Sequence, residues 1–354
     1  MRILKLKSQN LYPFLAALAN GAELWAPVKK QNKTAFLPLA AEEITKIDLE
    51  ATRTLLPPKK LFLPPSFNMF QVTAEGYKED LSWIKERILF GIHPCDIHGL
   101  LTLDRIFTQN FPDSYYLQAR QKTLILGLSC WPDEYCLCQS THTDIIEEGY
   151  DLFFTKLEDE YLVWIGSSQG DDLVRMKPGF FEENLNEADI QKYIEWREKR
   201  AQVFQRRINF VFMPDLMELK YHDSLWEKAA EACLACGSCS MVCPTCNCYN
   251  VRDEILLAGK PGRRVREWDS CTLPEYSQVA GGENFREKKS ARLKLWYTHK
   301  LQAFGSKYGK PSCVGCGRCL VTCPVGINVH SIASALEGKP SDAFWSRLRS
   351  EVKP

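Results

Sequence analysis

The stretch Cys233-Leu-Ala-Cys236-Gly-Ser-Cys239-Ser-Met-Val-Cys243-Pro244 recurs with the same spacing as Cys313-Val-Gly-Cys316-Gly-Arg-Cys319-Leu-Val-Thr-Cys323-Pro324. Both copies read C-x₂-C-x₂-C-x₃-C-P, a spacing typical of proteins that hold two [4Fe–4S] clusters. Three cysteines on one tight loop can reach three iron corners of a cube. The fourth, expected at the start of the next helix, points away and binds the other cube. The repeat therefore predicts two cubane clusters with crossed ligands.

The crossed pattern divides the eight cysteines between two sites. We assign to the first site Cys233, Cys236, Cys239 and Cys323, and to the second site Cys313, Cys316, Cys319 and Cys243. Gly237 and Gly317 follow the second cysteine of each loop, where a residue without Cβ lets backbone N–H groups approach the sulfides. A pair of zinc sites is the alternative, but zinc requires neither the third cysteine of the loop nor a crossed fourth ligand.

Four further cysteines lie upstream. Cys95 stands in Gly91-Ile-His-Pro-Cys95-Asp-Ile-His98, and the other three stand in Cys130-Trp-Pro-Asp-Glu-Tyr-Cys136-Leu-Cys138. A C-x₅-C-x-C loop with one remote cysteine supplies enough ligands for a third [4Fe–4S] cluster. Two other interpretations stay open at this spacing: buried structural thiols, and a zinc site that uses His93 or His98.

The last three cysteines are Cys246, Cys248 and Cys271. Three thiolates could hold a cluster with one non-cysteine or open iron site. They could equally be packing thiols, because free cysteine is among the most buried residue types, and this second interpretation is the one we favour.

Composition excludes several classes of protein. The chain has 354 residues, 15 cysteines and a formal net charge of +1, which gives no reason to expect nucleic acid as a partner. An odd number of cysteines argues against a closed disulfide framework. We find no secretory signal at the N-terminus, no apolar run near 18 residues and no G-x-G-x-x-G fingerprint. We therefore expect a cytoplasmic protein without membrane insertion and without a nicotinamide or flavin site of its own.

The pattern of predicted secondary structure changes near residue 210. Residues 1–210 combine short β-rich runs, a hairpin of Asp151–Thr155 with Tyr161–Ile165, and a helix over Asn186–Arg207. Residues 211–354 alternate helical stretches with cysteine-rich turns, and the segment Pro244–Ser312 also has much helical character. The predicted class is α+β: an N-terminal mixed α/β domain with the third cluster site, then a mainly α-helical, ferredoxin-like dicluster domain.

Several motifs together resemble the iron–sulfur subunit shared by anaerobic sulfite reductases and cytoplasmic sulfhydrogenases, in the latter the beta subunit. They occur in the family's order over nearly the whole chain: His93-Pro-Cys95-Asp-Ile-His98 followed by Leu103-Asp104, the Cys130–Cys138 loop, the run Cys233–Asn250, Arg266-Glu-Trp-Asp-Ser-Cys271, Val279-Ala-Gly-Gly-Glu-Asn-Phe-Arg286 and the motif that opens at Cys313.

The resemblance implies a protein without substrate chemistry of its own, in a hetero-oligomer. It would stand between a flavin subunit that oxidises NAD(P)H and a terminal subunit, which carries nickel–iron in the hydrogenases and sirohaem in the sulfite reductases. The resemblance also favours the third cluster at Cys95, Cys130, Cys136 and Cys138. It assigns no role to Cys246, Cys248 and Cys271.

Overall fold

The computed structural model describes residues 2–73, 75–255 and 262–340, and the chain divides into two compact units. Unit 1 comprises residues 1–63, 81–134 and 142–205. Unit 2 comprises residues 64–80, 135–141 and 206–354. The C-terminal unit therefore includes two short segments that lie far upstream in the sequence, and Cys136 and Cys138 belong to one of them.

Within the described residues, unit 1 is built around an eight-stranded sheet of order β10-β1-β9-β8-β7-β6-β2-β3. Its strands are β1 (Arg2–Lys7), β2 (Glu23–Lys30), β3 (Lys33–Leu39), β6 (Arg87–Ile92), β7 (Thr123–Leu128), β8 (Leu152–Leu157), β9 (Glu160–Ile165) and β10 (Phe181–Glu182). Strands β2, β6, β7 and β8 are parallel, and the other neighbours pair antiparallel. Parallel strands need crossover connections, and helices supply them here.

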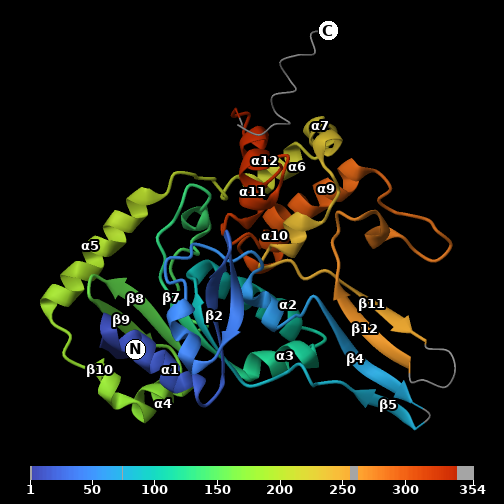
Figure 1. Cartoon of the computed structure of the whole chain (residues 1–354). Coiled ribbons are helices and arrows are strands. Elements are labelled where there is room, and N and C mark those ends of the chain that lie inside the picture. The colour runs from blue at the N-terminus through green and yellow to red at the C-terminus, as the bar shows by residue number, and fades with distance from the viewer. Residues whose placement is uncertain (1, 74, 256–261, 341–354) are drawn as a thin grey trace. The chain divides into compact units, whose positions relative to one another are not determined.

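Helices cover both faces of this sheet, as Figure 1 shows. The helical elements are α1 (Ser8–Ala19), α2 (Pro94–Thr108), α3 (Ser114–Gln121), α4 (Ser168–Met176), α5 (Glu187–Val203) and the 3₁₀ turns η1 (Ala41–Lys46), η2 (Pro58–Leu61) and η4 (Pro178–Phe180). Side chains alternate along each strand. Phe90 of β6 therefore packs with α1 and α4, while its neighbour Leu89 packs with α2 and α3.

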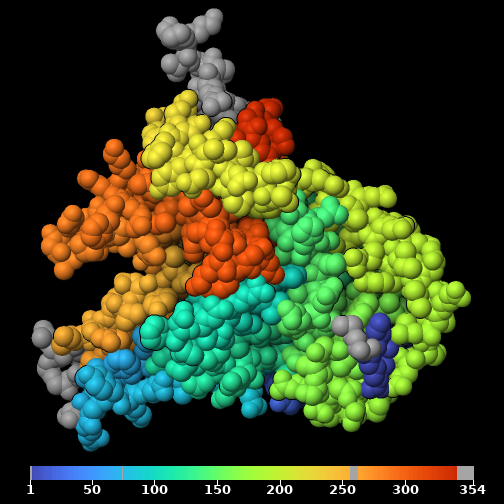
Figure 2. All heavy atoms as spheres, turned by 180° about the vertical axis from the view of Figure 1, so that it is seen from behind, coloured from blue at the N-terminus to red at the C-terminus, as the bar shows by residue number. Residues whose placement is uncertain are grey.

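Among the described residues of unit 2, four antiparallel strands form a second sheet of order β11-β12-β4-β5. The strands are β4 (Ser66–Thr73), β5 (Gly76–Glu79), β11 (Tyr249–Glu254) and β12 (Gly262–Trp268). Strand β4 pairs with β12 although the two are far apart in sequence. Figure 2 shows their surfaces side by side, blue for the early segment and gold for the late one.

The helices of unit 2 enclose one apolar core. They are α6 (Met213–Leu219), α7 (Leu225–Ala232), α8 (Ser238–Met241), α9 (Lys289–Thr298), α10 (Phe304–Tyr308), α11 (Arg318–Thr322) and α12 (Val329–Leu336), with the 3₁₀ turns η3 (Cys138–Thr141) and η5 (Pro274–Ser277) and the π-helical turn η6 (His299–Ala303). Trp226, Trp296 and Ile332 are buried in this core, and cysteines of both motifs pack against it.

The structure confirms the α+β class with a C-terminal dicluster domain, and it confirms the β8–β9 hairpin. The predicted helix over Asn186–Arg207 corresponds to α5. The helical character expected across Pro244–Ser312 is present only in its second half, because β11 and β12 occupy the first half. In the described ranges, no helix is both long enough and apolar enough to span a membrane.

Asp104 is the acceptor that joins α2 to α3. Its carboxylate accepts hydrogen bonds from the Tyr116 hydroxyl at 2.6 Å and from Nε and Nη2 of Arg120, both at 2.9 Å. Tyr116 is fully buried, and desolvation followed by the charge of Asp104 raises its pKa well above the usual value. This network fixes the two helices that cover one face of the sheet.

We expect Asp104→Ala to destabilise unit 1 by about 3 kcal/mol, because it leaves a largely buried guanidinium without its carboxylate. The measurement is urea denaturation followed by circular dichroism. Glu43→Ala is the control, since it breaks only the exposed contacts of Glu43 with Lys46 and Ala40 and should leave the midpoint almost unchanged. Equal shifts in the two variants would contradict this account.

Candidate metal centres

The two cysteine loops follow the same backbone path. The first loop runs from α7 into α8, and the second runs into α11. Matching positions are left-handed in both loops: φ is 51° at Ala235 and 61° at Gly315, and it is 73° at both Gly237 and Gly317. The repeat in sequence is therefore a repeat in conformation, as two equivalent ligand loops require.

The fourth cysteine of each motif follows the short helix that holds the third cysteine. Cys323 comes directly after α11, and its amide donates to the Cys319 carbonyl at 3.3 Å; Cys243 lies two residues beyond α8. The expectation that the fourth cysteine starts the next helix is wrong. Four residues make about one helical turn, so the fourth thiol is displaced along the short helix from the third.

The thiols of the first site are electrostatic neighbours across the two motifs. The pKa of Cys239 is raised to about 12, first by burial and then by the thiols of Cys233, Cys323 and Cys236, with Cys243 contributing least. Burial likewise raises the pKa of Cys233, and Cys323 adds to that shift before Cys236 does. Cys323 from the second motif is thus grouped with the three cysteines of the first loop.

The thiols of the second site are grouped in the mirror-image way. Burial raises the pKa of Cys313 to about 12, and Cys243 and Cys316 are its thiol neighbours. Burial also raises the pKa of Cys319 well above its usual value, and its thiol neighbours are Cys313, Cys316 and Cys243. The thiols whose charges act on one another therefore follow the division into two sets of four. Their ligation of iron stays a prediction.

The raised pKa values arise because the protein interior disfavours the negative charge of a thiolate. Coordination deprotonates a thiol, so a bound metal supplies the positive charge that the protein interior lacks. Cys236 is the exception: it is exposed, and hydrogen bonding by Ser238 lowers its pKa. The first site therefore has one thiol that faces solvent.

A buried lysine marks the second site. Lys300 is 4% exposed, and its ammonium donates to Cys243 Sγ at 3.2 Å and to Thr245 Oγ1 at 3.0 Å. Burial lowers the pKa of Lys300, yet the sulfur atoms of Cys243, Cys246 and Cys313 hold it well above its usual value. A buried ammonium requires a negative partner. A cluster bound by four thiolates is negatively charged, so this surrounding fits the cluster.

The segment Tyr135–Thr141 packs onto the second loop within unit 2. The Leu137 amide donates to the Gly315 carbonyl at 2.7 Å. A Cβ on Gly315 would stand 2.3 Å from the Leu137 carbonyl carbon, and one on Gly317 would stand 2.5 Å from the Tyr135 oxygen. The close approach is a steric reason for Gly317 in addition to access of amides to sulfide, whereas the nearest atom to a Cβ on Gly237 would be in the Ser270 side chain, at 3.3 Å. The close approaches at Gly315 and Gly317 also fix the buried Cys136 and Cys138 beside Leu137.

The other two upstream cysteines belong to unit 1. Cys95 lies in the first turn of α2, and Cys130 follows β7. The buried Arg200 donates to the Cys130 carbonyl at 2.7 Å and to Asp144 at 3.2 Å. The grouping of Cys95, Cys130, Cys136 and Cys138 into one site stays a prediction.

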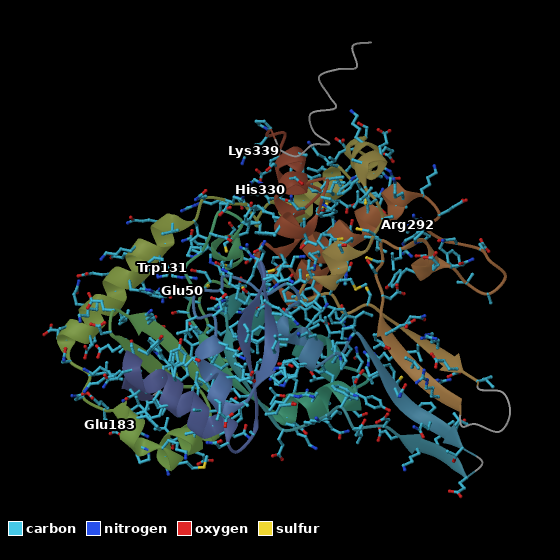
Figure 3. The ribbon with its side chains drawn as sticks, in the orientation of Figure 1. Glu50, Trp131, Glu183, Arg292, His330 and Lys339 are labelled. Carbon is cyan, nitrogen blue, oxygen red and sulfur yellow. The ribbon has the colours of Figure 1, made fainter. Side chains whose placement is uncertain are left out.

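A cavity of about 540 Å³ opens beside Cys130. Trp131 and Glu50 both line it, and Figure 3 shows these two side chains near each other. Trp196 of α5 lines the same cavity and contacts the Trp131 ring edge-on, with 5.9 Å between the ring centres. Cys130 lines this cavity, whereas Cys95, Cys136 and Cys138 do not.

The zinc interpretation with His93 has no support in the geometry. The two ring nitrogens of His93 lie 2.9 Å from the Leu128 carbonyl and 2.6 Å from the Ala51 carbonyl, so the ring is engaged on both sides. In the parts of the chain that the structure describes, no three or more Cys, His, Asp or Glu side chains are placed to hold a single metal ion.

Cys248 and Cys271 meet at the base of the β11–β12 hairpin. Asp269 N donates to the Cys248 carbonyl at 3.0 Å, and each of the two thiols shifts the pKa of the other. Cys271 lowers the pKa of Cys248 below its usual value, burial opposes that shift, and Tyr276 adds to it. Arg292 of α9, marked in Figure 3, donates to the Thr272 carbonyl next to Cys271. Sequence reasoning missed this pairing, because only the hairpin brings the two cysteines together.

Comparisons with known proteins agree with this geometry. Residues 232–327 match the family described as 4Fe-4S dicluster domain. The chain is 39% identical over 330 residues to the sulfhydrogenase 2 subunit beta of Pyrococcus furiosus. The match covers 92% of this chain and 96% of that protein.

We expect Gly315→Ala to destabilise unit 2 and to lower its iron content. The new methyl group would overlap the Leu137 backbone, in addition to straining a left-handed residue. Gly309→Ala is the matched control, since Gly309 has φ 78° and nothing lies within 4 Å of the position that a Cβ would take there. The control should cost only about 1–2 kcal/mol for the left-handed conformation.

Thermal unfolding and iron content of the two purified variants provide the measurement. If Gly315→Ala unfolds at the same temperature as Gly309→Ala and binds as much iron, the close packing of Leu137 on Gly315 does not stabilise unit 2.

Proposed function

Because this chain belongs to the family of the sulfhydrogenase beta subunit, we propose that it relays electrons from an NAD(P)H-oxidising flavin subunit to a nickel–iron catalytic subunit. The coarser statement, that it is an iron–sulfur electron-transfer subunit, follows from the relative and the dicluster domain together. The partners and the direction of transfer are the proposed part.

The observation that supports the proposal is the electrostatic influence between thiols of the two cysteine motifs in unit 2. The charge of Cys323 acts on Cys233 of the first loop, and that of Cys243 acts on Cys313 of the second, as two crossed four-thiol sites would require. When bound, [4Fe–4S] clusters supply one-electron transfer. Two adjacent sites in one core are what a relay needs, since an electron can pass between them without leaving the protein.

The residues of the chain have distinct roles in this proposal. Thiolates would hold the iron, and backbone amides of the two loops would donate to sulfide. The apolar core of α7, α9 and α12 would keep water away, and the exposed Cys236 would offer the first site to a partner. Cys95, Cys130, Cys136 and Cys138 are proposed as ligands of a third cluster.

The iron–sulfur subunit of an anaerobic sirohaem sulfite reductase is the alternative within the same family. The shared motifs do not separate the two, whereas the near full-length match to a sulfhydrogenase subunit favours the hydrogenase. The catalytic subunit that co-purifies with the chain decides between them: nickel in the complex supports the hydrogenase, and sirohaem absorption supports the reductase.

Two other classes of function make different predictions. A self-sufficient oxidoreductase with an open iron at Cys246, Cys248 and Cys271 would turn over with artificial electron donors alone. A metal-bound regulator would bind its partner differently when its clusters are lost. The match to a hydrogenase subunit favours neither.

We expect anaerobically purified protein to contain about 12 irons and as many labile sulfides per chain, and Cys136→Ser to contain about 8. The loss of four irons would come from the third site, because Cys136 belongs to neither crossed group. Cys271→Ser is the control, and it should keep about 12 irons if Cys271 is a packing thiol.

About 8 irons in both the parent and Cys136→Ser would make the four upstream cysteines structural. Loss of iron from Cys271→Ser would instead place a cluster at the hairpin base. Zinc in place of iron would overturn the relay itself.

A further inference from the structure

Lys300 stands at an irregular point of a long helical run in unit 2. Helix α9 passes through the π-helical turn η6 into α10, and Lys300 is the second residue of that turn. Single π-helical turns occur frequently at functional sites. The Lys300 carbonyl accepts from the Ser312 amide at 3.0 Å, directly before Cys313. The backbone of Lys300 is thus attached to the second loop.

The ammonium of Lys300 reaches the other part of the same site. It donates to the sulfur of Cys243, the crossed ligand, at 3.2 Å, and to Thr245 at 3.0 Å. It also lies 5.0 Å from the centre of the Trp296 ring, within the range of a cation–π contact. Lys300 therefore touches both segments that build the second site, and its charge is directed at sulfur.

The first site has no such contact among its described residues. Its nearest counterpart is Lys289, a half-buried residue at the start of α9. Lys289 donates to the Cys233 carbonyl at 2.7 Å, not to a thiol. The two loops share their conformation, and a cation that donates to sulfur is one feature by which the second site differs from the first.

We propose that Lys300 raises the reduction potential of the second cluster, so that this cluster is the more readily reduced of the two. The inference rests on the proposed electron-transfer function and adds a role for one residue. Reduction makes a thiolate-bound cluster more negative, and an N–H···S bond from a cation stabilises that form. A buried charge acts strongly because little water screens it.

The consequence is an ordered relay. An electron that enters through the first site, whose Cys236 faces solvent, moves on to the second site and rests there. Without the ammonium, the second site would lose the cation that donates directly to one of its sulfur atoms, and the two potentials should move closer together.

The test is an anaerobic redox titration of the full-length protein, followed by electron paramagnetic resonance. We compare the parent with Lys300→Met, which keeps the length and apolar stem but removes the charge. The comparison is made at the potential where half of the second cluster is reduced in the parent. At that potential, the ratio of reduced to oxidised second cluster should be at least tenfold lower in Lys300→Met than in the parent. For a one-electron centre, tenfold corresponds to about 59 mV.

Lys289→Met is the matched control, because it removes a lysine beside the first site that donates to backbone carbonyls and not to sulfur. It should leave the ratio of the second cluster within about twofold of the parent, because water screens a charge near the surface. The signal of the second cluster is identified independently as the one altered by Cys316→Ser.

An unchanged ratio in Lys300→Met, with full iron content and both signals present, overturns the inference and leaves the relay intact. If Lys300→Met loses four irons, Lys300→Gln replaces it, since an amide can still donate to Cys243 and Thr245. A tenfold fall in Lys300→Gln supports the inference, and no fall overturns it. Loss of iron from both variants also overturns it, because Lys300 would then be needed to assemble the site. Absence of iron from the parent contradicts the proposed function instead.

Discussion

The crossed ligation that we propose is a constraint that ties the two cysteine motifs of the C-terminal unit to each other. Each proposed cube takes three thiolates from one loop and the fourth from the other motif, so neither loop completes its site alone. Correct placement of Cys243 and Cys323 needs α8 and α11 to face each other, and contacts between these two helices are present in the structure. The core around Trp226, Trp296 and Ile332 supplies the rigid support for both. The repeated motif and the packing of the helices together would place each fourth cysteine beside the loop of the other motif.

Burial creates a second requirement, which the two sites meet differently. Thiols such as Cys239 and Cys313 have raised pKa values because an isolated negative charge is unfavourable in the core. A metal removes that cost, and each cluster still retains net negative charge. At the first site, water can stabilise negative charge because Cys236 is exposed. At the second site, the buried ammonium of Lys300 stabilises it. The same motif can therefore hold clusters in unequal surroundings.

The sequence predicted best what short-range spacing controls. Motif spacing predicted the dicluster domain, and two apolar runs on either side of an acidic turn predicted the β8–β9 hairpin, because both are local patterns. Strand β11 escaped prediction because five of its six residues are exposed and it lacks an apolar alternation. Its sheet is completed by β4, from a distant segment, and only tertiary pairing reveals that. The packing of Leu137 on Gly315 is non-local in the same way.

Lys300 shows why a site's chemistry is harder to predict than its ligands. Cysteine spacing is a property of one short segment, but the Lys300 contact depends on a π-helical turn and on the path of Thr245 after the first motif. In the sequence, Lys300 is one of several basic residues on a helical stretch, where a solvated position is the ordinary expectation. The π-helical turn changes the direction of the side chains that follow α9, and burial then converts an ordinary surface charge into one that acts on sulfur. Ligand identity is thus encoded locally, whereas the electrostatic difference between two equivalent motifs is encoded in how the rest of the unit packs around them.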